Sequence, residues 1–138
     1  MNSHKIVRIS TSAFIVLSAL SFLSVSLMAF ANPQSVMDLV NVKLENADAF
    51  SSIRGIYGGV GLALCISLVY LLVKSPQTGL KFLMLIWGLY AVSRIITIFT
   101  EGSLGAFGMQ WLITESFFFT IALVLLFAGR NSWQAKTI

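Results

Sequence analysis

Charge is scarce in this sequence. Only 10% of the 138 residues are Asp, Glu, Lys or Arg, whereas a typical soluble domain has about 25%. Hydrophobic residues make up 57% of the chain, compared with roughly 45–50% in soluble domains. A soluble fold needs a polar surface that this composition does not supply, so we expect most of the surface to face lipid.

Residues that bind metals or start covalent chemistry are also rare. Cys65 is the only cysteine and His4 the only histidine, which leaves no intrachain disulfide and no credible zinc site. Cys65 lies in an apolar run and is expected to be a packing residue. The first apolar run carries scattered serines, but no histidine is available in the membrane as a base. We therefore expect no catalytic residue, metal or cofactor, and a protein that is not an enzyme.

Long apolar runs dominate what is present. They cover about residues 6–31, 51–73, 80–100 and 109–128, and a spanning helix needs about 20 such residues. Helices satisfy their own backbone hydrogen bonds in lipid, and the chain lacks the alternating strands of a membrane barrel. The sequence predicts an all-α integral membrane four-helix bundle, with a single transmembrane domain over residues 1–138.

The first run has a rival interpretation as a signal peptide. Lys5 and Arg8 precede it, and Ala29-Phe30-Ala31 resembles a small-residue cleavage site. A signal core has about 7–15 apolar residues, and this run is longer. We therefore expect the helix to be retained.

The connections contain residues that end and start helices. Asn32-Pro33 ends the first helix, and the second could be capped by Asp48, Ser51 or Ser52. A polar turn over residues 74–79 joins helices two and three, and glycines mark the turn over residues 101–108.

The longest connection runs from Asn32 to Phe50. Val36, Leu39, Val40 and Leu44 fall near helical spacing with polar residues between them, which predicts a short amphipathic helix on the membrane surface, in the first outer loop. Val40, Val42 and Leu44 also alternate with polar residues, so a strand stays open.

The basic residues indicate an orientation rather than a nucleic-acid partner. Although the net charge is +4, the bases lie in short segments between apolar runs. With the N-terminus inside, Lys43 is the only base in the outer loops, so the positive-inside rule places both termini in the cytoplasm. Trp133 would anchor the inner end. The bases of the inner segments are Lys5, Arg8, Lys74, Lys81, Arg130 and Lys136.

Some charges fall within or at the ends of the predicted spans, where they usually pair or line a wet cavity. Arg94 and Glu115 are equally far from the centre of the turn between helices three and four. Arg54 and Glu101 are likewise at equal depth across the turn between helices two and three. The sequence therefore predicts two Arg–Glu ion pairs.

Aromatic side chains share the helix faces that carry these charges. The faces combine into a predicted outer-facing pocket, which could bind a lipid or small amphiphile or dock a partner subunit. Its candidate residues are Arg54, Tyr57, Trp87, Tyr90, Arg94, Glu101, Trp111 and Glu115. The plainer alternative is that the pairs only hold the helices in register.

Small residues are concentrated in the second run. Gly55 and Gly59 are spaced as GxxxG, with Gly58 and Gly61 beside them, and such residues let helices approach closely. Packing within the bundle is one expectation, and homodimer formation through this face is another. Serines of the first run could bond across helices; they are Ser10, Ser18, Ser21, Ser24 and Ser26.

The stretch from Ser51 to Gly59, SSIRGIYGG, resembles the opening of helix two in domain-of-unknown-function family 4345. Gly88, Ser93-Arg94, Glu101-Gly102 and Glu115 are also similar to that family; the acidic residue at the position of Glu101 is often Asp there. The resemblance covers nearly the whole chain. It implies four helices and a bacterial inner membrane, and no established activity. A remoter architectural likeness is to DoxX-like proteins, some of which accompany quinone-linked oxidoreductases.

Two classes of function other than catalysis remain open. The first is a non-enzymatic membrane protein that uses the pocket. The alternative is a small transporter or proton-coupled carrier that uses Glu115, although the chain shows no internal repeats or broken helices.

Overall fold

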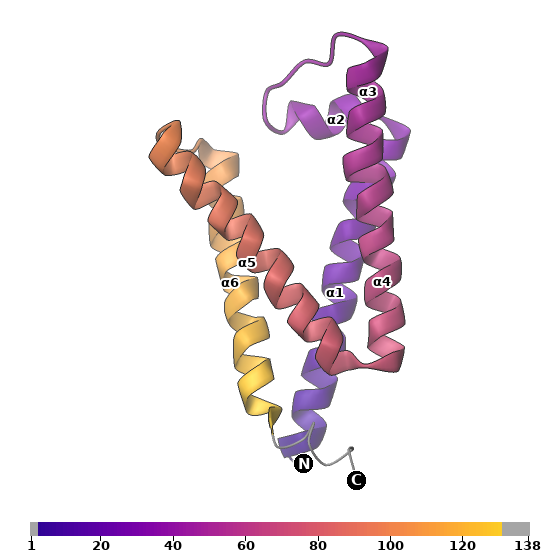
Figure 1. Ribbon diagram of the computed structural model, residues 1–138, viewed down its shortest axis with the longest axis vertical. Helices are drawn as coiled ribbons and strands as arrows, with labels where there is room; N and C mark the ends of the chain where they lie inside the picture. Colours follow the sequence, from indigo (N-terminus) through magenta and orange to yellow (C-terminus); the bar gives the residue numbers. More distant parts are fainter. Residues whose placement is uncertain (1–2, 131–138) are drawn as a thin grey trace. The chain divides into compact units, whose positions relative to one another are not determined.

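Every regular element in the described part of the chain is a helix. The computed structural model describes residues 3–130 and contains no strand within them (Figure 1). The elements are α1 (Ser3–Ala31), α2 (Pro33–Asp38), α3 (Ala47–Ile53), the π-helix η1 (Arg54–Val60), α4 (Gly61–Lys74), α5 (Pro76–Thr100) and α6 (Ala106–Ala128).

Four helical segments are long and apolar enough to cross a membrane. They are Lys5–Ala31, Ala47–Lys74, Pro76–Thr100 and Ala106–Ala128. The all-α, multi-pass membrane prediction is confirmed, and the bilayer is the protein's solvent. The helices begin three to four residues earlier than the predicted starts at 6, 51, 80 and 109. Hydropathy marks the part of a helix that suits lipid, whereas polar first turns such as Pro76-Gln77-Thr78 lie outside that part.

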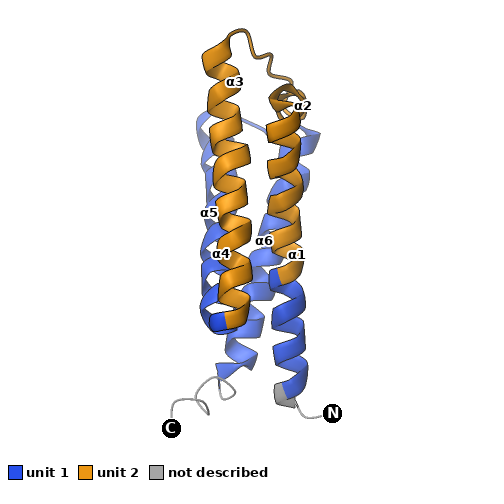
Figure 2. Cartoon of the chain, turned by 90° about the vertical axis from the view of Figure 1, so that its right-hand side faces the viewer, with its two compact units in different colours: residues 1–15, 74–138 blue, residues 16–73 orange. Residues whose placement is uncertain are grey.

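The chain divides into two compact units, shown in different colours in Figure 2. Unit 1 comprises residues 1–15 and 74–138, and unit 2 comprises residues 16–73. Helix α1 thus contributes its first half to one unit and its second half to the other. The single transmembrane domain over residues 1–138 stays a prediction.

Unit 1 is built on the antiparallel hairpin of α5 and α6, which lie side by side (Figure 1). Pro76 occupies the first turn of α5, where a missing N–H costs nothing. The helix ends at Thr100, and Gly102 follows with a φ of +105°, a conformation that favours glycine. This turn reverses the chain into α6. Buried apolar residues of the unit include Leu80, Leu83 and Ala122.

Unit 2 contains all but the last residue of a continuous helical stretch over residues 47–74, with the π-helix within it. Asn46 caps its start, because its Oδ1 accepts a hydrogen bond from the N–H of Ala49 at 2.9 Å. The predicted cap at Asp48, Ser51 or Ser52 is therefore wrong. Asn46 precedes the apolar run by several residues, so hydropathy does not indicate that the helix begins there.

The connection between α1 and α3 differs from its prediction. Helix α2 spans only Pro33–Asp38, so Leu39, Val40 and Leu44 of the predicted amphipathic helix lie beyond its end. Its apolar residues Val36 and Met37 are buried beside Ala29 rather than presented outward. The alternative strand is absent from this segment. Asn41 adopts a φ of 57° soon after α2, a backbone conformation that breaks helical periodicity.

Candidate functional site

Arg94 of α5 and Glu115 of α6 form an ion pair within unit 1. The Nε of Arg94 donates to Oε2 of Glu115 at 2.7 Å, and its Nη2 donates to Oε1 at 2.9 Å. Both carboxylate oxygens are engaged in this fork-to-fork geometry, which is the strong form of the interaction. The equal-depth argument for this pair agrees with the observed contact.

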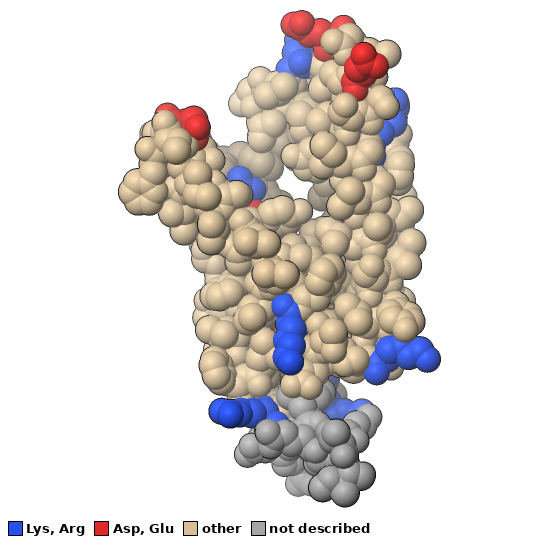
Figure 3. All heavy atoms as spheres, in the orientation of Figure 1, with Lys and Arg blue, Asp and Glu red and all other residues tan. Residues whose placement is uncertain are grey.

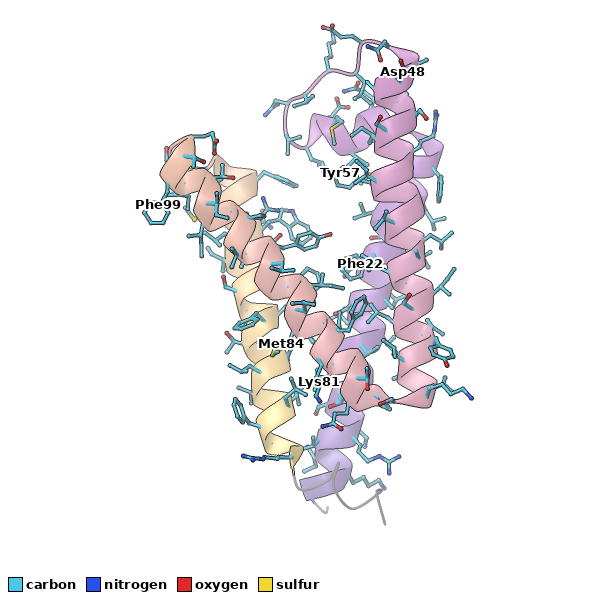
Figure 4. The ribbon with its side chains drawn as sticks, viewed as in Figure 1. Phe22, Asp48, Tyr57, Lys81, Met84 and Phe99 are labelled. Atoms are coloured by element: carbon cyan, nitrogen blue, oxygen red, sulfur yellow. The ribbon has the colours of Figure 1, made fainter. Side chains whose placement is uncertain are left out.

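The pair lies well inside the apolar hairpin. Arg94 precedes the end of α5 at Thr100 by six residues, which is about 9 Å along a helix axis. Glu115 follows the start of α6 at Ala106 by nine residues, or about 14 Å. Within unit 1, the exposed acid Glu101 caps the end of α5. Lys81 lies near the start of the same helix. Figure 4 shows Lys81 and the exposed Phe99 towards opposite ends of α5.

The two partners differ in accessibility. The Glu115 side chain is 3% exposed, whereas that of Arg94 is 27% exposed. A guanidinium has five N–H donors, and the recorded bonds to Glu115 use two of them. Arg94 is therefore the more accessible partner, and its guanidinium has N–H groups beyond the two that bond Glu115.

Aromatic rings pack edge to face near the middle of the hairpin. Trp87 packs edge-on against Phe118 with a centroid distance of 5.0 Å, and Phe118 packs against Phe14 of α1 at 5.5 Å. Trp87 also meets Tyr90 at 6.2 Å. Such edge-to-face pairs contribute about 0.5–1.5 kcal/mol each beyond area burial. Phe14 lies outside the predicted set, and the edge-to-face contacts of Phe14 and Phe118 were not predicted from the sequence.

Tyr90 and Trp111 lie one helical turn from the ion pair. Tyr90 precedes Arg94 on α5 by four residues and is 44% exposed. Trp111 precedes Glu115 on α6 by four residues and packs against Phe107 at 6.2 Å. Trp87, Tyr90, Trp111 and the pair thus all belong to unit 1.

Arg54 and Glu101 have local partners. Arg54 and Tyr57 lie in the π-helix of unit 2, and Arg54 Nε donates to the carbonyl of Phe30 at 3.4 Å, near the end of α1. Glu101 at the end of α5 accepts a hydrogen bond from the hydroxyl of Thr100. Arg54 and Glu101 belong to different units, so their pairing, and a pocket that joins them, stay predictions.

The glycines divide into two pairs. A Cβ on Gly58 would lie 2.9 Å from the ring of Phe30, and one on Gly61 would lie 3.3 Å from Cβ of Ser26. These glycines let the 47–74 helix approach α1. Gly55 and Gly59, which form the GxxxG motif, have no neighbouring atom within 4 Å of such a Cβ. The motif therefore does not pack within unit 2, and its role in a homodimer stays a prediction.

One serine of α1 bonds across helices. Ser26 Oγ donates to the carbonyl of Gly58 at 2.7 Å, in a buried position. Ser21 and Ser24 instead donate to carbonyls of their own helix. The serines have similar apolar neighbours in the sequence, so sequence patterns did not single out Ser26, and the acceptor Gly58 lies in a π-helix that they did not predict.

Comparisons with known proteins identify one family. The family model described as "Domain of unknown function (DUF4345)" matches residues 10–126, which include all seven helical elements in whole or in large part. No curated protein and no solved structure matches the chain.

Proposed function

The chain belongs to the DUF4345 family, and we propose that this member is a non-enzymatic membrane protein that binds the phosphate or carboxylate group of a lipid or small amphiphile at Arg94. The description of the family carries no activity, so the proposal is based on the geometry of the ion pair and its aromatic neighbours.

One observation carries the proposal: the more accessible partner of the pair is the arginine. Glu115 is almost fully buried, while Arg94 remains 27% exposed within a membrane-spanning helix. A cationic donor in an apolar surrounding is stabilised by a further acceptor, and arginine geometry suits phosphate and carboxylate oxygens. Glu115 holds the Nε and Nη2 edge of the guanidinium, which leaves the Nη1 edge for a ligand.

The aromatic residues support an amphiphile rather than a small inorganic anion. Tyr90 and Trp111 flank the charged groups, and Tyr90 combines an apolar ring with a polar hydroxyl. Such residues suit a molecule with an acidic head and an apolar tail. A purely structural pair would explain the bonds between Arg94 and Glu115, but it gives no role to the other N–H groups of Arg94.

Mass spectrometry of the purified protein tests this proposal. We expect the native protein, released gently from detergent, to retain a molecule that contains phosphate or carboxylate. Arg94→Met should lose this molecule. Lys81→Met is the matched control, because it removes one positive charge from the same helix at the other end, and it should retain the molecule.

A second variant separates binding from folding. The Arg94→Met change leaves Glu115 buried without its partner, so it also lowers stability. The double variant Arg94→Met/Glu115→Gln removes both charges and should fold, yet should still lack the ligand. No retained molecule in the native protein, or equal retention in all variants, would count against the proposal.

The transporter alternative uses Glu115 as a proton carrier. Both of its oxygens are bonded to Arg94, so protonation would require the pair to open, and this observation favours binding over transport. Proton flux into liposomes that falls in Glu115→Gln, but not in Lys81→Met, would instead support the transporter.

We also propose a location in a bacterial inner membrane with cytoplasmic termini. The first part follows from the family resemblance, and the second from the basic residues. Figure 3 shows Lys and Arg near the end of unit 1 where α6 finishes, and acidic residues near its α5–α6 turn and, separately, at the α2–α3 end of unit 2. Lys136 and Trp133 lie outside the described residues. Homodimerisation or docking of a partner subunit remains a further proposal.

A further inference from the structure

The connection from α1 to α3 forms a small ordered cap at one end of unit 2. Helix α2 begins at Pro33, two residues after α1 ends at Ala31, and lies across the ends of α1 and α3 rather than along them (Figure 1). With α1 and the 47–74 helix as membrane spans, α2 would lie roughly in the plane of the membrane.

Gln34 fixes the loop that follows α2. Its Nε2 donates to Oδ1 of Asp38 at 2.7 Å and to the carbonyl of Val42 at 2.9 Å. Its Oε1 accepts from the N–H of Leu44 at 2.9 Å. One side chain thus ties both sides of the loop over residues 39–43 to α2, so the loop has a defined conformation.

The cap divides its apolar residues into two groups. Val36 and Met37 are buried against Ala29, with Leu44 and Ile53 packed around them. Leu39, Val40 and Val42 instead remain exposed, at 44%, 47% and 48%. The same fixed loop therefore has a packed apolar interior and a separate apolar exterior.

We propose that Leu39, Val40 and Val42 insert into the headgroup region of the bilayer and anchor this end of unit 2 to the lipid surface. The continuity of the apolar surface supports a lipid occupant: Leu27 and Phe30, in the last turns of the spanning helix α1, are also exposed. Fixed loops that carry apolar residues beside a span suit the boundary between headgroups and acyl chains. Lys43 adjoins Val42 and can place its ammonium among lipid phosphates.

This anchor is independent of the proposed binding at Arg94. It belongs to unit 2 and uses none of the residues of the ion pair. A protein that binds no amphiphile at Arg94 would still require a surface for these side chains.

Fluorescence quenching of a labelled full-length protein tests the anchor. In a Cys65→Ser background, an environment-sensitive dye is attached through Val40→Cys, and in a matched control through Glu45→Cys. Both proteins are placed in phosphatidylcholine vesicles. The quenchers are a doxyl group near the top of the lipid acyl chain and iodide in the water.

We expect lipid quenching to be severalfold stronger at the Val40 position than at the Glu45 position, with the reverse order for iodide. Adding Gln34→Ala, which removes the bonds of the loop but no apolar residue, should reduce this contrast. Equal quenching at both positions would overturn the proposal. Protection of the Val40 label from both quenchers would overturn it as well, because protein rather than lipid would then cover the loop.

Discussion

At the scale of single residues, the pair of Arg94 and Glu115 has the largest consequences. Each is isolated in an apolar span, and each finds its partner on the neighbouring helix of the same unit. Removing one partner leaves a charge without compensation, whereas removing both leaves a packing defect and lost hydrogen bonds. A comparison of single and double variants therefore separates the interaction energy of the pair from the contribution of its surroundings.

A double-mutant cycle measures the coupling of this pair. Glu115→Gln or Arg94→Met alone should lower the free energy of unfolding by about 3–5 kcal/mol, as for other buried pairs. The double variant should lose less than either single variant, because no charge is then left without its partner. Thermal unfolding in detergent provides the values, and a coupling near zero would show that the two residues do not interact.

Gly58 offers a second prediction at this scale. A Cβ added at Gly58 would contact the ring of Phe30, whereas one added at Gly55, in the same π-helix, would meet no atom within 4 Å. Gly58→Leu should therefore be less stable than Gly55→Leu by about 1–3 kcal/mol, the usual cost of overpacking. Both changes replace the same residue type, so propensity largely cancels. Equal melting temperatures would mean that α1 does not pack on Gly58.

At the scale of elements, the π-helix takes part in the contact between α1 and the 47–74 helix. Ser26 reaches the carbonyl of Gly58 within it. Ser26→Ala should cost about 0.6 kcal/mol, the average for such bonds in membranes, and no more than about 1.7. Ser24→Ala is the control, because the exposed Ser24 bonds only within its own helix. An equal effect of both changes on the unfolding midpoint would argue against the interhelical bond.

Sequence patterns predicted the elements better than their ends. Apolar length identified the four spans, and equal depth paired Arg94 with Glu115, because helix geometry in a tight hairpin is regular. The π-helix, the cap at Asn46 and the role of Gln34 depend on local backbone geometry that has no periodic signature. The predicted amphipathic helix was too long because helical spacing of Val36, Val40 and Leu44 does not reveal that Gln34 folds the loop back.

At the scale of the whole molecule, the central prediction is orientation. Both termini and the α4–α5 turn should be cytoplasmic, and the α2–α3 cap should face the other side. Single cysteines in a Cys65→Ser background test this: Glu45→Cys should react with an impermeant thiol reagent in intact cells, and Thr78→Cys only after permeabilisation. The opposite pattern would invert the topology.

The most direct test of the account is a high-resolution crystal structure of the protein grown from a lipid phase. We predict non-protein density within hydrogen-bonding distance of the Arg94 guanidinium, on the edge that Glu115 does not occupy, with the tail of the molecule against apolar side chains. A well-ordered Arg94 whose remaining N–H groups bond only protein atoms would contradict the account, and would make the pair a purely structural link between α5 and α6.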